Sequence, residues 1–220
     1  MGIIPFTAEI YYRLLDRIAS ELGLAAFASL LLAVLALALM AKPSAAGGRL
    51  IAGAMAIMWA WCGAVFQWQY FSALFWPAPL FALLFALEAG LLIWLGAVQG
   101  VLSFGYGTGL RGRTGTGLAL AGIVLFPAIG SLAGFYAPLA GLPGLTPGAT
   151  VLFTLGLLML SRNRPPRVLY AVPLIWAVLA AITGGFLGMW EQLALPVAAL
   201  LAAALPRKDR SSTESQSPGH

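Results

Sequence analysis

Charged residues are scarce in this sequence. Only 9% of its 220 residues are Asp, Glu, Lys or Arg, whereas 61% are hydrophobic. Because a soluble domain carries about 25% charged residues, the composition excludes a soluble globular protein. A formal net charge of +5 can indicate nucleic-acid binding, but here the charges sit in short segments between long apolar runs. The lipid bilayer is therefore the expected partner, and nucleic acid is not.

Cysteine and histidine are almost absent. The single cysteine, Cys62, lies inside an apolar run, and the single histidine, His220, ends a polar tail. One cysteine cannot form an intrachain disulfide, and these two residues cannot build a zinc, haem or iron–sulfur site. Since no nucleophile is paired with a base, we predict no catalytic, cofactor-binding or metal-binding residues.

Long apolar runs are abundant. The longest covers residues 50–98 and contains one formal charge, Glu88. It has room for two helices of about 20 residues each, with a turn at residues 71–79, and we expect the bundle to be organised around it. The predicted fold is an all-α, polytopic transmembrane helical bundle of seven spans. Apart from the two spans within residues 50–98, these are residues 22–41, 115–136, 147–161, 168–187 and 192–205.

The segment before the first span, residues 1–21, is amphipathic. Its apolar side chains recur at helical spacing with the charged ones mostly opposite, and Thr7 can serve as the N-cap. The pattern predicts an N-terminal helix that either lies on the membrane surface or packs on the bundle. Residues 22–205 then form the seven-span domain. Residues 206–220, rich in serine and charge, predict a disordered cytoplasmic tail.

The fifth predicted span is short. Residues 147–161 cover about 22 Å at ~1.5 Å per residue, less than the ~30 Å hydrocarbon core. The preceding residues 137–146 carry no charge. We therefore expect this loop to dip into the membrane, or the bilayer to thin locally.

The basic residues predict an orientation. With seven spans, ten of the 12 Lys and Arg residues fall on one face and two, Arg13 and Arg17, on the other. The face rich in Lys and Arg is normally cytoplasmic, which places the N-terminus outside and the C-terminus in the cytoplasm, in the bacterial inner membrane. Two arginine clusters on this face either bind anionic lipid headgroups or act only as topology determinants. They are Arg111 with Arg113, and Arg162 with Arg164 and Arg167.

A few polar side chains within the spans are the candidates for a functional site. Glu88 lies near the middle of its span, where a charge costs ~2.5–3.5 kcal/mol and a functional role is the default hypothesis. The alternative is a neutral Glu that only bonds a neighbouring helix. Gln67 and Gln69 either line an outward-facing polar cavity with Thr150 and Thr154, or bond water and headgroups at the interface.

These residues favour a non-catalytic integral membrane protein, such as an accessory or assembly protein. The alternative is a small transporter or channel for a proton, a cation or a small molecule, with Glu88 in its pathway. A transporter requires a polar cavity that reaches Glu88, whereas an accessory protein tolerates a dry core there. The sequence does not specify an oligomeric state.

Five stretches of the sequence are similar to segments of a known family. They are IPFTAEIYYRLL, WAWCGAVFQWQYFS, LIWLGAVQGVLSF, PGATVLFTLGLLML and VPLIWAVLAAITGGFLG. Together they resemble an uncharacterised family of bacterial multipass membrane proteins, the domain of unknown function 6064. The resemblance covers nearly the whole chain and implies a multipass fold, with no established activity to transfer. In the family pattern, Pro-Cys-Pro-Thr stands where this chain has residues 147–150, and His stands at Gln67.

Overall fold

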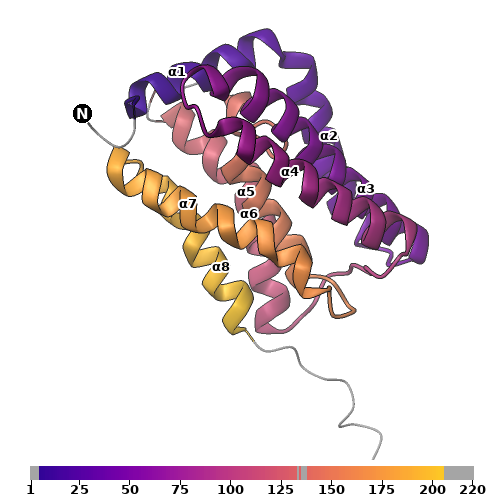
Figure 1. Cartoon of the computed structure of the whole chain (residues 1–220). Coiled ribbons are helices and arrows are strands. Elements are labelled where there is room, and N and C mark those ends of the chain that lie inside the picture. Colours follow the sequence, from indigo (N-terminus) through magenta and orange to yellow (C-terminus); the bar gives the residue numbers. More distant parts are fainter. Residues whose placement is uncertain (1–4, 133, 135–137, 206–220) are drawn as a thin grey trace, which may run out of the picture.

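The chain folds into a bundle of helices. The computed structural model describes residues 5–132, 134 and 138–205, and these contain helices but no β-sheet (Figure 1). The all-α prediction is confirmed for this part of the chain. The predicted tail, residues 206–220, lies outside the described residues. The α-helices are α1 (Ala8–Glu21), α2 (Gly23–Leu39), α3 (Ala45–Trp61), α4 (Ala78–Leu91), α5 (Leu110–Leu132), α6 (Pro147–Met159), α7 (Ala171–Leu187) and α8 (Ala194–Ala204).

Helix α6 forms the centre of the bundle (Figure 1). Each of its 13 residues is buried, and it packs against α3, α5, α7 and α8. The closest approach is to α5, where Gly156 faces the backbone of Ala119 and Gly122 faces Phe153. The expectation that residues 50–98 organise the bundle is therefore wrong. A span that is apolar all round has no sequence period that distinguishes a central helix from a lipid-facing one.

The α3–α4 hairpin has the predicted turn, which falls between Ala73 and Ala78. Both helices continue as π-helices, η1 (Cys62–Tyr70) and η3 (Leu92–Val98). Small residues hold the two arms together, because Gly63 faces Ala82 and Phe85 while Gly96 faces Ala52.

Membrane-length helices number four among the described residues. They are Ala45–Ala73, Ala78–Val98, Leu110–Leu132 and Arg167–Leu187, and α1 with α2 makes a fifth if this pair, bent by 90°, counts as one span. Two of the seven predicted spans, α6 and Trp190–Ala204, are shorter apolar helices, so seven spans are not confirmed. The fourth predicted span also begins earlier than expected, so Arg111 and Arg113 lie in the first turn of α5 and not in a loop.

Helix α1 packs on the bundle, as one of the two alternatives for residues 1–21 requires. The Thr7 hydroxyl accepts a hydrogen bond from the Ile10 amide at 3.4 Å, which confirms the predicted cap. The buried side chains of α1, which include Tyr12, Leu15 and Ile18, point towards the bundle. Beside α1, residues 140–146 are buried as well. The uncharged loop of residues 137–146 thus packs into the bundle over residues 140–146, whereas Leu139 is exposed and Ala137 lies outside the described residues.

The basic side chains of residues 42–49, 111–113 and 162–167 gather at one end of the bundle, which we call the basic end, whereas Arg13 and Arg17 lie on α1 at the opposite end. The loop of residues 99–109 connects its parts: Gly100 lies against the Arg49 side chain, Gly105 against Arg162, and Tyr106 donates to the Leu37 carbonyl at 2.8 Å. At the opposite end, Tyr12 donates to Glu191 at 2.7 Å and Tyr70 donates to Glu21 at 2.5 Å.

The α5–α6 crossing predicts opposite effects of one substitution at two glycines. A Cβ at Gly156 would lie 2.4 Å from the Ala119 nitrogen, so Gly156→Ala should lower the free energy of unfolding by about 1–3 kcal/mol. A Cβ at Gly117 would meet nothing within 4 Å, so Gly117→Ala should raise it by about 0.5–1 kcal/mol. Unfolding midpoints of both variants in one detergent check this. A stable Gly156→Ala variant would contradict the close crossing.

Candidate functional site

The structure separates the five polar candidates. Gln67, Glu88, Thr150 and Thr154 are buried, whereas Gln69 is exposed. Gln69 lines a surface hollow beside Arg17, Glu21 and Tyr70. The alternative in which Gln67 and Gln69 line one outward-facing polar cavity with Thr150 and Thr154 is therefore wrong, because Gln69 lies on the surface and the other three side chains are buried. Residues two apart on a helix point in different directions, so burying Gln67 turns Gln69 outward.

The two threonines have partners. The Thr150 hydroxyl accepts from the Gly144 amide at 2.7 Å and donates to the Thr146 carbonyl at 2.6 Å. The Thr154 hydroxyl accepts from the indole nitrogen of Trp59 at 2.8 Å. Thr150 thus fixes the buried loop to α6, and Thr154 joins α6 to α3. Both side chains stabilise the core and leave little hydrogen-bonding capacity for a ligand.

Glu88 and Gln67 are fully buried without partners. Neither side chain is exposed to solvent, and their polar atoms make no hydrogen bond to the described residues. An ionisable side chain buried without a partner is costly. Glu88 lies on the buried face of α4, next to Phe85 and Ala89.

Glu88 and Gln67 do not form one site. The hairpin register pairs Ala52 with Gly96 and Gly63 with Phe85. An antiparallel pair with this register sets Gln67 level with α4 about seven residues before Glu88, or roughly 10 Å along the helix axis. The predicted intramembrane polar site is thus two separate unpartnered groups and two satisfied threonines.

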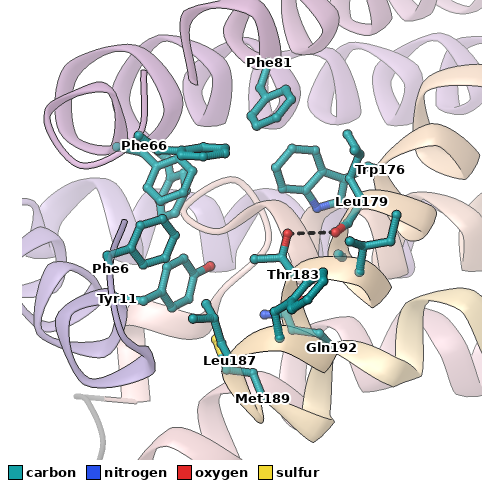
Figure 2. A pocket seen from close by; sticks show the side chains of 15 residues that line it. Phe6, Tyr11, Phe66, Phe81, Trp176, Leu179, Thr183, Leu187, Met189 and Gln192 are labelled. Atoms are coloured by element: carbon teal, nitrogen blue, oxygen red, sulfur yellow. Dashed lines mark hydrogen bonds between the residues drawn. The ribbon is translucent and has the colours of Figure 1, made fainter. Parts of the chain in front are cut away.

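An aromatic cavity lies near the end of the bundle opposite to the basic end (Figure 2). Its volume is about 200 Å³. Phe6 and Tyr11 form one side, and α7 with Met189 and Gln192 forms the other, with Phe66 and Phe81 above. Three segments that are distant in sequence, residues 6–11, 66–81 and 176–192, therefore meet around one space.

Ring contacts build the wall of the aromatic cavity. Phe71 contacts Phe6 at a centroid distance of 5.4 Å and Phe75 at 5.7 Å, and Phe81 contacts Trp176 at 5.4 Å. Such distances and tilted geometries are favourable for aromatic pairs. The rings connect the N-terminal segment, the hairpin turn and α7, so the wall is held by side chains that pack against one another.

The polar groups at the cavity are few and uncharged. Tyr11, Thr183 and Gln192 line it, and the Thr183 hydroxyl donates to the Leu179 carbonyl at 2.8 Å. Ile182 and Phe186 also line the cavity and are 53% and 64% exposed on the outer face of α7. The cavity thus opens sideways at the apolar surface of the bundle, and its chemistry is that of a mostly apolar pocket with a few orienting groups.

Helix α1 is anchored over this cavity by an exposed charge cluster. Glu21 accepts from the Arg17 guanidinium at 2.7 Å and from the Tyr70 hydroxyl. The hydrogen bond from Arg17, reinforced by that from Tyr70, lowers the pKa of Glu21 below its usual value. The cluster ties the end of α1 to η1, and Tyr11 on α1 is thereby held against Phe66.

Sequence reasoning missed the aromatic cavity. Aromatic residues clustered near a turn between two spans, here Trp68, Tyr70, Phe71 and Trp76, are typical of the membrane–water interface. Trp68 and Trp76 are 60% and 81% exposed, as an interfacial position requires, but Phe71 is buried in the cavity wall. The concentration of aromatics near the turn was the available signal, but pairing them with α7 required the tertiary fold.

Among the described residues, no group of three His, Cys, Asp or Glu could hold a metal ion.

A family model described as a family of unknown function, DUF6064, matches residues 8–217. The match confirms the resemblance drawn from the sequence. No curated protein and no solved structure matches the chain.

The contrast between Glu88 and Thr154 predicts opposite effects on stability. Glu88→Leu removes a buried polar group that has no described partner, so it should raise the free energy of unfolding by about 1–3 kcal/mol. Thr154→Val keeps the size but leaves the Trp59 indole N–H unpaired, so it should lower it by about 1–3 kcal/mol. Denaturant midpoints measured on both variants check this. A destabilised Glu88→Leu variant would mean that Glu88 makes a stabilising interaction.

Proposed function

The chain belongs to the DUF6064 family, whose function is unknown, and we propose that it is a non-catalytic integral membrane protein that binds an amphiphilic molecule taken from the bilayer. The observation that carries the proposal is the aromatic cavity with its sideways opening at Ile182 and Phe186. A ligand in the bilayer reaches this opening without crossing water. The role is then that of an accessory protein that holds or presents the molecule.

The cavity restricts the chemistry of the guest. No Lys, Arg, Asp or Glu lines it, so a charged headgroup would be left unpaired inside. Its volume of about 200 Å³ is below the ~300–1,000 Å³ of pockets that enclose a whole drug-sized ligand. We therefore propose that one apolar end of the guest, an acyl chain or a ring, enters among the phenylalanines. Tyr11, Thr183 and Gln192 can each orient an uncharged polar group.

We propose the seven-span topology in the bacterial inner membrane as the setting of this function. Support comes from the exposed apolar side chains on α2, α4 and α7, such as Phe27, Leu83 and Val178. Non-helical backbone is tolerated at membrane depth where protein buries it. Residues 140–146 meet this condition, so the loop and α6 together can complete one crossing although α6 alone is short.

The alternative function, transport with Glu88 in the pathway, requires a polar route to Glu88. The aromatic cavity is not lined by Glu88, and the carboxyl group has no polar partner among the described residues. These observations favour the accessory role, and transport stays an alternative prediction.

A photoactivatable fatty acid with a terminal diazirine tests the cavity. In proteoliposomes it should label buried wall residues such as Phe66 and Phe71, which bulk lipid does not reach. Ala180→Phe fills the cavity from α7 and should remove most of this labelling. Val178→Phe adds the same bulk on the exposed face of α7 and should leave it unchanged. Mass spectrometry of the labelled peptides gives the readout, and equal labelling in both variants would refute the proposal.

Topology reporters inserted at turns test the seven crossings. Reporters at Ser44, Gly107 and Asn163 should read cytoplasm, and those at Trp76, Gly134 and Gly188 should read the outer side. Gly134 and Gly188 have positive φ and open space around them, so an insertion there meets no packed neighbour. The decisive pair is Gly134 and Asn163, which flank the buried loop and α6. If both report the same side, α6 with its loop does not cross the membrane.

A further inference from the structure

A second cavity lies at the basic end, where four segments of the chain meet. Its volume is about 590 Å³, within the ~300–1,000 Å³ typical of ligand sites. The end of α2, the loop of residues 99–109, the first turn of α5 and the turn after α6 all contribute to its lining, including Pro43, Tyr106 and Ser161. We call it the basic pocket.

Hydrogen bonds fix the loop that forms one wall of the basic pocket. The Gly105 amide donates to the Leu160 carbonyl at 3.2 Å, and the Arg162 amide donates to the Ser103 carbonyl at 2.5 Å. Glycine is required where the loop closes, because a Cβ at Gly112 would lie 2.4 Å from the Gly107 oxygen. The pocket is therefore a built feature of the fold.

The three segments that form the basic pocket carry charge of one sign. Arg111, Arg162 and Arg164 line it, and residues 40–49, 99–113 and 159–170 together contain seven Lys and Arg but no Asp or Glu. A concentration of cationic side chains in a cavity attracts anions.

Arg111 is held in place beside the basic pocket. One terminal nitrogen donates to the carbonyls of Ala202 and Leu205, at 3.3 and 2.7 Å, which pins the guanidinium at the end of α8. Its Nε is buried and has no acceptor among the described residues. Arg111 also lies in the first turn of α5, and a helix N-terminus presents unpaired amides and a positive dipole to an anion.

We infer that the basic pocket binds a phosphate-type oxyanion, carried either by a lipid headgroup or by a small soluble molecule. Guanidinium groups and helix amides are the donors that phosphate oxygens prefer. This site is independent of the aromatic cavity, which lies near the other end of the bundle and is lined by no charged side chain.

Binding measurements on the purified full-length protein in neutral detergent, at fixed ionic strength, test the inference. The probes are dioctanoyl-phosphatidylglycerol, inorganic phosphate, and dioctanoylglycerol as the phosphate-free control. Binding of the phospholipid alone identifies a headgroup site, and binding of phosphate identifies a site for soluble anions. Either result supports the inference. Binding of neither, or equal binding of dioctanoylglycerol and the phospholipid, overturns it.

A matched pair of variants separates the pocket from the general field of the basic end. Arg162→Gln removes a lining guanidinium and should weaken binding of the active probe by roughly tenfold. Arg167→Gln removes the same charge from the same turn but not from the pocket lining, so it should leave affinity nearly unchanged. Both side chains are exposed, so both variants should unfold at the wild-type temperature without probe. Equal losses of affinity would show diffuse attraction and overturn the site.

Discussion

The enclosure of α6 is the constraint on which the rest of this structure depends. Because all 13 residues of α6 are buried, the chain entering and leaving it must satisfy its backbone polar groups within the protein. Before α6, the Thr150 hydroxyl accepts a hydrogen bond from the Gly144 amide, and the Ser29 hydroxyl donates one to the Pro143 carbonyl. After α6, the Leu160 carbonyl accepts a hydrogen bond from the Gly105 amide. Both ends of the central helix are thus closed by hydrogen bonds to other segments.

The two cavities follow from those closures. At the N-terminal end of α6, Gly148 lies against Phe126 and the side chain of Gln192, which also lines the aromatic cavity. At the C-terminal end, Met159 and Leu160 contribute to the basic pocket. The partial negative charge of a helix C-terminus favours nearby cations, and Arg162 and Arg164 follow directly. One buried helix therefore positions an apolar site at one end and a cationic site at the other.

Much of the fold was predictable, because composition and hydrophobic runs act locally. The helical class, the hairpin of residues 50–98 with its turn, and the Thr7 cap all rest on signals within a few residues. The number of spans could not be predicted from such local signals, because a short central helix such as α6 and a short peripheral helix such as α8 look alike in sequence. A repeat of small residues is an equally weak signal. Alanine recurs every four residues at Ala52, Ala56, Ala60 and Ala64, but four residues advance about 40° past a full turn, and only the first two alanines are buried.

The candidate site was less predictable, because hydrogen-bond partners are tertiary. Thr154 and Gln67 are both polar residues in apolar helices, and the sequence grouped them together. In the fold, Thr154 meets the Trp59 indole while Gln67 meets no described partner. Which polar group is satisfied depends on the side chain that the neighbouring helix presents at that level, and this is set by register and crossing geometry.

Trp176 connects the aromatic cavity with the part of α4 that carries Glu88. It lines the aromatic cavity and contacts Phe85 at a centroid distance of 5.1 Å, and Phe85 in turn contacts Trp59 at 4.5 Å. Glu88 follows Phe85 by one turn on the buried face of α4. Closely packed interiors transmit displacement because they hold few voids. A guest that displaces Trp176 would therefore press on Phe85, which lies one turn before the unpartnered carboxyl group of Glu88 on α4. The aromatic cavity and the buried acid are distinct sites joined by one continuous set of side-chain contacts.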